Sequence, residues 1–311
     1  MILFKNKHGE IRAGWALALI MAIYYASWFC VAELTQAIAS LAVKIGGSPD
    51  LGNQILAAVF GTALFRVLAG ALMIGLLWLM FKLVYNRPFV QIGLYKAGFL
   101  KQMGFGLLFG IAVASLVVLI LLAVGAAQLT ELNLANIFTP AVWNVFVIFL
   151  SVGIYEEILT RGAMMTVLKT TRNKWLIVLV PSAIFGLIHL FNHNIALLPV
   201  INIALFGVLF SYLFAKTGRL WAPIGLHITW NLFTGIIYGM PVSGSSFASL
   251  AIIELTGSKW LTGGAFGVEG GVLCTLVVVL GLAYVHFFVK QAEGFWGFDS
   301  GLPLVRGGGN D

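Results

Sequence analysis

Residues 102–127, QMGFGLLFGIAVASLVVLILLAVGAA, decide the class to which this protein belongs. The stretch carries no charged side chain and is longer than the roughly 20 apolar residues that cross about 30 Å of hydrocarbon as a helix. A spanning segment has to satisfy its own backbone hydrogen bonds in the bilayer, and a helix does so. The sequence therefore predicts a membrane-spanning helix here.

The composition of the whole chain has the same character. Of the 311 residues, 60% are hydrophobic and 9% are charged, against roughly 25% charged in an ordinary soluble domain. These values exclude a disordered protein, a collagen-like fibre and a disulfide-stapled secreted domain. The alternating polarity of a membrane β-barrel is not seen either, so the composition predicts an integral, helical membrane protein.

Eight stretches have the length and the hydropathy of spanning helices. We therefore expect an all-α, polytopic helical bundle with about eight transmembrane helices, forming one integral membrane domain over residues 1–311. The expected spans are 13–34, 54–81, 102–127, 140–168, 175–191, 196–215, 220–240 and 267–289. A further apolar stretch, 244–256, is too short to span and is expected to be interfacial or re-entrant.

The basic residues indicate an orientation in the membrane rather than a nucleic-acid partner. The formal net charge is +7, but no run rich in Lys and Arg with interleaved aromatic residues occurs, so nucleic-acid binding is not expected. If the chain crosses eight times, Lys and Arg gather on one side, where the positive-inside rule places the cytoplasm. Both termini are then cytoplasmic, in a plasma (inner) membrane. That side carries Lys5, Lys7, Arg12, Lys82, Arg87, Lys96, Lys101, Lys169, Arg172, Lys174, Lys216, Arg219, Lys290 and Arg306, while the other carries Lys44 and Lys259.

Polar residues inside three of the spans are the candidates for chemistry, because ionisable side chains are costly in a membrane. The fourth span contains EEILTR at 156–161, the fifth FGLIH at 185–189 and the seventh HITWN at 227–231. The region that contains them, 140–240, is the expected catalytic core.

Helical spacing assigns a role to each carboxylate of the first motif. Glu157 and Arg161 lie four residues apart and share a helix face, so we expect a structural ion pair that neutralises the buried charge. Glu156 points elsewhere, without a local partner, which makes it the candidate general base.

The other two motifs supply the groups that would act with this base. His227 and Asn231 share a face, and the Asn231 amide suits the stabilisation of an oxyanion. His189 has one donor and one acceptor with which to position a water beside Glu156. Each histidine alone has an ordinary structural interpretation as a hydrogen bond between helices. Together with Glu156 and Asn231 they favour a catalytic cluster.

A metal site is the competing chemical interpretation. Glu156, His189 and His227 would offer three zinc ligands and leave one position open for water. The H-E-x-x-H motif is missing, and the imidazoles come from different helices. The residues thus favour metal-free glutamate catalysis and leave a divalent metal, zinc, as the alternative cofactor.

The three motifs resemble those of the CPBP family, the CAAX proteases and bacteriocin-processing enzymes, which includes the Ras-converting prenyl endopeptidases. The family pattern of E-E-x-x-x-R, F-x-x-x-H and H-x-x-x-N occurs here in order, and the resemblance covers about residues 143–232. It implies an intramembrane endopeptidase in which Glu156 and His189 activate water while His227 and Asn231 form the oxyanion site. It implies a membrane-presented substrate as partner, either a prenylated CaaX-like protein or a bacteriocin or other peptide.

Two other classes of function stay open. A non-catalytic scaffold, immunity or regulatory protein of the same family would keep the polar cluster as structural glue, and Glu156→Gln would then preserve its phenotype. A proton-coupled transporter would use the buried carboxylates, but no inverted repeat or pair of broken helices is seen.

The motifs also have to reach a common depth in the membrane. At 1.5 Å per residue, His189 lies about 21 Å from the cytoplasmic start of its span and His227 about 11 Å from its own. Helix tilt, a sunken helix end or a kink near the glutamates is expected to remove this difference.

Overall fold

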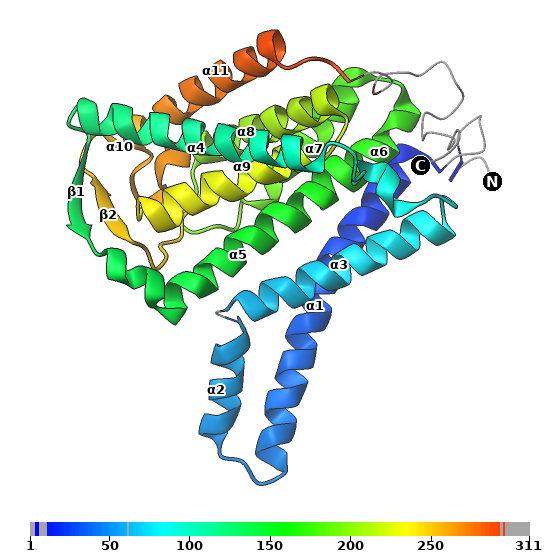
Figure 1. Ribbon diagram of the computed structural model, residues 1–311. Helices are drawn as coiled ribbons and strands as arrows, with labels where there is room; N and C mark the ends of the chain where they lie inside the picture. Colours follow the sequence, from blue (N-terminus) through cyan, green and yellow to red (C-terminus); the bar gives the residue numbers. More distant parts are fainter. Residues whose placement is uncertain (1–3, 6–10, 61, 293–294, 296–311) are drawn as a thin grey trace.

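The computed structural model describes residues 4–5, 11–60, 62–292 and 295, which form a helical bundle with one small antiparallel sheet (Figure 1). The predicted all-α class is confirmed as the main architecture. The helices and strands are α1 Ala13–Lys44, α2 Pro49–Phe60, α3 Ala63–Leu83, α4 Phe99–Ala123, β1 Ala127–Leu132, α5 Pro140–Glu157, α6 Met165–Leu168, α7 Lys174–Ile188, α8 Leu197–Thr217, α9 Trp221–Asn231, β2 Ala251–Leu255, α10 Lys259–Thr262 and α11 Val272–Phe288.

Five helical stretches within the described part of the chain are long and apolar enough to cross a membrane. They are α1, α3, α4, the continuous stretch Pro140–Thr171 and α8. Two further apolar helices, α7 and α11, are shorter. The chain is therefore an integral membrane protein, while the number of eight crossings stays a prediction.

The second expected span, 54–81, is divided into two helices. Thr62 has an extended backbone (φ −117°, ψ 170°) that separates α2 from α3, and the Ala63 amide donates to Oδ1 of Asn144 at 2.8 Å. The first helix is also longer than expected, because α1 continues to Lys44. As a result α1 and α2 form a helical hairpin that projects from the rest of the bundle (Figure 1).

The two-stranded sheet was not predicted. Its second strand lies within the stretch 244–256 that was expected to be interfacial or re-entrant, and its first strand follows α4 directly. Ala127 pairs with Leu255, and a bulge interrupts the register between Leu129 and Glu131. The sheet joins the end of α4 to a segment far along the chain, and hydrophobic periodicity does not encode a pairing of this kind.

The bundle has two chemically different ends. The basic end consists of residues 84–98, 169–173, 216–220 and 289–292, and the sheet end of β1, β2 and residues 189–196, 238–250 and 256–271. At the basic end, Trp221 Nε1 donates to the Tyr95 carbonyl at 2.7 Å. At the sheet end, the Gly244 amide donates to the Phe266 carbonyl at 2.9 Å.

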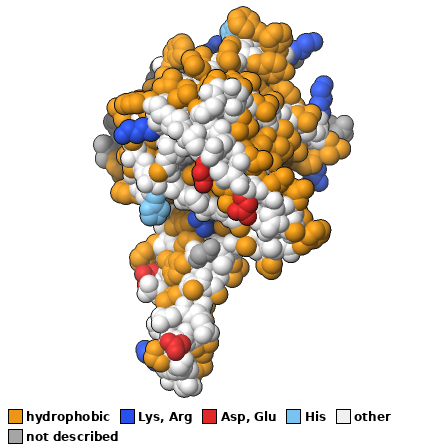
Figure 2. All heavy atoms as spheres, turned by 90° about the vertical axis from the view of Figure 1, so that its left-hand side faces the viewer, with side chains coloured by type: hydrophobic (Ala, Val, Ile, Leu, Met, Phe, Trp, Pro, Cys, Tyr) orange, Lys and Arg blue, Asp and Glu red, His pale blue; other side chains and the backbone are white. Residues whose placement is uncertain are grey.

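The basic end holds many of the Lys and Arg residues assigned to the cytoplasm, among them Lys96, Lys169 and Arg219. Lys7 and Arg306, which were assigned to the same side, lie outside the described residues. Figure 2 looks onto the sheet end, where backbone and uncharged polar side chains gather near the centre and hydrophobic side chains surround them. This distribution suits an end that meets water between lipid-facing flanks.

Helix α9, which carries the third motif, packs closely against α4. A Cβ on Gly106 would collide with the Ala222 carbonyl, and one on Gly110 would lie 2.5 Å from the Leu226 carbonyl. Small residues four apart allow this close approach of two helices. The Thr229 hydroxyl also donates to the Leu107 carbonyl of α4 at 2.9 Å, so α4 fixes the position of α9.

Candidate active site

The first motif lies where α5 changes into a π-helix. Glu156 and Glu157 are the last residues of α5, and the π-helix Ile158–Met164 follows directly. The third motif ends in the same way, because the π-helix Leu232–Ile237 begins after Asn231. Short π-helical segments occur frequently at functional sites.

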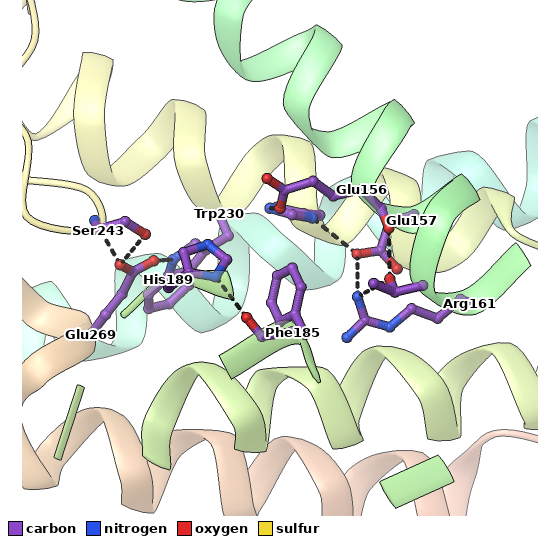
Figure 3. Close-up of polar contacts among 10 residues, drawn as sticks. Glu156, Glu157, Arg161, Phe185, His189, Trp230, Ser243 and Glu269 are labelled. Atoms are coloured by element: carbon purple, nitrogen blue, oxygen red, sulfur yellow. Dashed lines mark hydrogen bonds and ion pairs between the residues drawn. The ribbon is translucent and has the colours of Figure 1, made fainter. Parts of the chain in front are cut away.

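Glu157 is the centre of a buried polar network (Figure 3). Its Oε1 accepts from Nη1 of Arg161 at 3.0 Å and from Nδ1 of His227 at 3.0 Å. The ion pair expected from the four-residue spacing is thus present. The link from Glu157 to His227 was missed, because sequence spacing on one helix says nothing about a partner on another.

The Arg161 guanidinium is fully buried and is held on several sides. Its Nη1 also donates to the Thr160 hydroxyl at 2.7 Å. It lies over the rings of Phe185 and Phe210, 4.5 and 5.0 Å from their centroids. Aromatic faces stabilise a desolvated guanidinium, so Arg161 serves to hold Glu157 rather than to meet the solvent.

Glu156 diverges from this network, as its position in the helix predicted. Oε2 of Glu156 lies 3.9 Å from Nε2 of His227. This oxygen is buried, and it makes no hydrogen bond with any residue in the described part of the chain. Glu156 is the carboxylate of the pair that lines the cavity described below.

His227 is oriented by its neighbours. Its ring stacks on Phe210 with centroids 5.1 Å apart and meets Phe185 edge-on at 6.0 Å. Because a carboxylate only accepts, Nδ1 of His227 donates to Glu157. The other ring nitrogen, Nε2, is directed toward Glu156.

His189 follows the last residue of α7 and caps the end of its own helix. Its Nδ1 donates to the Phe185 carbonyl at 2.7 Å, which makes Nε2 the acceptor of the neutral ring. The Phe185 ring is 4.9 Å from the His189 ring and 6.0 Å from that of His227. The two imidazoles therefore flank one aromatic side chain, and the expected depth difference does not keep them from a common cavity.

Asn231 lies one turn beyond His227 on α9. The residue is 5% exposed and lines the cavity. Among the described residues it has no side-chain hydrogen-bond partner, so its amide is available to a ligand.

These groups meet in a cavity of about 390 Å³. Glu156, His189, His227 and Asn231 all contribute to its wall. Aromatic side chains from α1, α5 and the 238–250 segment supply much of the remainder, among them Trp28, Phe149 and Phe247. The cavity therefore brings the carboxylate, the two imidazoles and the amide of the three motifs together, beside aromatic side chains and further polar residues such as Arg66 and Glu269.

Glu269 is a cavity residue that the sequence analysis did not single out. Its Oε1 accepts from Nε1 of Trp230 at 2.8 Å, and its Oε2 accepts from the amide and hydroxyl of Ser243 at 2.7 and 2.9 Å (Figure 3). It thus joins the loop at Ser243 to α9 beside Asn231. The signal was present, because Glu269 is an ionisable residue inside the expected span 267–289.

The zinc alternative finds no complete ligand set. Among the described residues, no three His, Cys, Asp or Glu side chains form a group that could hold a metal ion. His227 and Glu156 approach each other. Nδ1 of each imidazole is engaged, by Glu157 for His227 and by the Phe185 carbonyl for His189, which leaves Nε2 of both rings available, as in zinc-binding histidines. In this arrangement of the described residues, Glu156, His189 and His227 do not form a group of three zinc ligands, and zinc stays the alternative cofactor.

Comparisons with known proteins identify the region that carries the motifs. Residues 138–233 match the family described as Type II CAAX prenyl endopeptidase Rce1-like. A protein of Bacillus subtilis (strain 168) described as "Putative membrane peptidase YdiL" is 33% identical over 89 residues, which are 29% of this chain and 34% of that protein. The chain thus aligns with about a third of the length of this relative. No solved structure matches.

The matched region includes all three motifs, from Glu156 to Asn231. It also includes α5, the π-helix after it, α7, α8 and α9, which are the elements that place the polar side chains in the cavity. The match to the Rce1-like type II CAAX prenyl endopeptidase family thus covers the part of the chain that carries the three motifs.

Proposed function

We propose that this chain is an intramembrane endopeptidase whose catalytic core, residues 140–240, uses Glu156 to activate a water molecule. The observation that carries the proposal is the state of Glu156, which lines the cavity and whose buried Oε2 atom has no hydrogen-bond partner among the described residues. A carboxylate in this state is suited to accept a proton from water. The family match and the similarity to a membrane peptidase support the same reaction class.

In the proposed reaction, Glu156 takes a proton from water while Nε2 of His189 accepts a hydrogen bond from the same water. The oxygen attacks the carbonyl carbon of the scissile peptide bond and forms a tetrahedral intermediate. Glu156 then returns the proton to the leaving nitrogen, and the carbon–nitrogen bond breaks. The products are a carboxylic acid and an amine, and the glutamate is regenerated.

The negative charge on the carbonyl oxygen would be met by Asn231 and His227. An amide N–H of Asn231 is a fixed donor of the kind that stabilises an oxyanion. Because Nδ1 of His227 donates to Glu157, Nε2 carries a proton only in the imidazolium form. In the proposal this form donates to the oxyanion, and Glu157 orients the ring by accepting from Nδ1.

The proposed substrate is a polypeptide that the membrane presents to the cavity. The matched family is described by its action on prenylated CAAX proteins, and a bacteriocin or other peptide is the alternative. Arrangement in a plasma (inner) membrane with both termini in the cytoplasm belongs to the same proposal.

The test compares new peptide termini in membranes that carry the wild type or the Glu156→Gln variant at equal expression. Termini that depend on the wild type are expected to vanish with Glu156→Gln, which keeps the shape of the side chain but removes the base. Glu254→Gln is the matched control, because it changes an exposed carboxylate on β2 outside the cavity. Identical termini with wild type and Glu156→Gln would instead favour a non-catalytic scaffold.

A further inference from the structure

Exposure along the cavity wall is greatest at the loop that follows α7. Glu156 is 8% exposed and His227 6%, so the proposed catalytic groups form the bottom. Phe191 and His193, which line the same cavity, are exposed, and Phe191 reaches 91%. The mouth of the cavity is therefore at the loop that follows α7.

The residues around this mouth belong to the sheet end of the bundle. Besides Phe191 and His193, the rim includes Ser243 and Ser245 of the 238–250 segment. The rim is held in place, since Asn192 Nδ2 donates to the Ser243 carbonyl at 3.1 Å, and Glu269 holds Ser243 as described above.

The opposite direction is closed by the protein. Between the first motif and the basic end lie Leu159, Met164, Leu220 and Ile224, all of which are buried in one apolar cluster. Arg161 is fully buried among them. A polypeptide approaching from the basic end would have to displace this packed region.

The distribution of Lys and Arg indicates on which side of the membrane each end of the bundle lies. Lys and Arg gather at the basic end, and the positive-inside rule assigns that end to the cytoplasm. We infer that the cavity opens to the extracytoplasmic side, and that its substrate is a polypeptide whose scissile segment lies outside the cytoplasm. The part of this inference that concerns the substrate rests on the proposed function. The direction in which the cavity opens does not depend on it.

The direction of opening distinguishes two substrate classes that are both compatible with the three motifs. A prenylated carboxyl terminus held at the cytoplasmic leaflet lies on the side of the basic end, away from the mouth. An exported or membrane-anchored polypeptide can insert an extended segment through the mouth and meet the apolar side chains of Trp28, Phe149 and Phe247 that line the cavity.

Cysteine labelling in right-side-out vesicles with a membrane-impermeant maleimide tests the direction of opening. The background variant replaces the two native thiols, Cys30 and Cys274, by alanine. Single cysteines are then placed at Ser245 in the mouth, at Gln128 on the exposed face of β1 and at Ala97 in the exposed loop of the basic end. Gln128→Cys and Ala97→Cys report the sides of the two ends, and Ser245→Cys reports the cavity.

The expected result is labelling of Ser245→Cys and Gln128→Cys in intact vesicles, with at least tenfold less labelling of Ala97→Cys until the vesicles are permeabilised. Labelling of Ala97→Cys alone would overturn the inference by reversing the topology. Labelling of Gln128→Cys without Ser245→Cys would overturn it by closing the mouth to that side. Each thiol is titrated in detergent-denatured protein, so that a missing signal reports access and not reactivity.

The labelling result does not depend on whether the protein cleaves peptides, so this inference and the proposed function can be contradicted separately. Adding Glu156→Gln to the Ser245→Cys variant should leave the labelling unchanged. If wild-type-dependent termini are found, they should lie in extracytoplasmic segments. Termini confined to cytoplasmic segments would overturn the inferred substrate class while leaving the endopeptidase proposal intact.

Discussion

At the scale of single residues, one carboxylate organises the polar cluster. Glu157 accepts from both Arg161 and His227 through the same Oε1 atom. A buried charge is tolerated only when it is paired, and a pair that loses one partner leaves the other uncompensated. The neighbouring Glu156 stays outside this ion pair because Glu157 neutralises the arginine, and the proposed function uses that freedom.

Removal of Arg161 is therefore expected to destabilise the fold. Arg161→Met should lower the free energy of unfolding by about 3–5 kcal/mol, since Glu157 then stays buried without the guanidinium that pairs with it. Arg161→Lys, which keeps the charge, should cost less, and the double variant Glu157→Gln/Arg161→Met should regain part of the loss. The stabilities of these three variants are compared by thermal unfolding in detergent. Equal melting temperatures for Arg161→Met and Arg161→Lys would contradict the ion-pair argument.

Asn231 allows a separate test of the oxyanion site. Asn231→Ala should reduce kcat by about 10²–10³-fold, the usual effect of losing one oxyanion donor, with a small change in KM. The melting temperature should stay close to that of the wild type, because the Asn231 side chain has no hydrogen-bond partner among the described residues. The rate is measured on the substrate that the terminus comparison identifies. Asn53→Ala, at an exposed position on α2, is the control and should retain full activity.

At the scale of the elements, the contact between α4 and α9 sets the place of the third motif. Gly106 of α4 faces Ala222 of α9 across a gap with no room for a side chain. Gly104 lies on the same helix with open space around it. The two glycines are two residues apart, so their side chains would point to nearly opposite directions of the helix.

This pair gives a matched prediction for helix packing. Gly106→Ala should destabilise the protein by about 1–3 kcal/mol through overpacking. It should also lower activity by about 10²-fold if α9 moves by 1 Å. Gly104→Ala should leave both properties near wild type, since alanine there favours the helix and meets nothing. Melting temperature and cleavage rate of both variants are compared in one detergent. Similar losses in the two variants would mean that α4 tolerates no alanine at all, and the packing argument would fail.

At the scale of the whole molecule, the polar cluster lies between two apolar cores. One core gathers residues of α4, α8, α9 and α11, among them Phe206 and Trp230. The other gathers residues of α1, α3, α5 and the π-helix after α5, among them Tyr155 and Leu159. At the sheet end, β1 and β2 close the bundle across a large separation in sequence (Figure 1). The sheet thus ties the cavity rim in the 238–250 segment to α4.

The register of this sheet can be tested by a disulfide. Gln128 and Glu254 are direct partners in the antiparallel pair, where Cα atoms lie about 4.5–5.5 Å apart, within the range of about 4.4–6.8 Å that a disulfide needs. In the background without native cysteines, Gln128→Cys/Glu254→Cys should cross-link under mild oxidation and change gel mobility. Gln128→Cys/Ile252→Cys joins two exposed positions that are out of register and should not. Cross-linking of both pairs at equal rates would show that the strands slide.

The sequence by itself determined the membrane class and the helical architecture. It also predicted that Glu157 and Arg161 share one helix face, that His227 and Asn231 share another, and that Glu156 points away from the ion pair. These follow from local rules, because hydropathy sets what a segment can span and a four-residue spacing sets which side chains share a face. Only the tertiary structure decided that Glu157 also binds His227, that Glu269 holds the cavity rim and that β1 pairs with β2. Each of these contacts joins segments far apart in the chain, and no local period encodes which helices or strands become neighbours when the bundle closes.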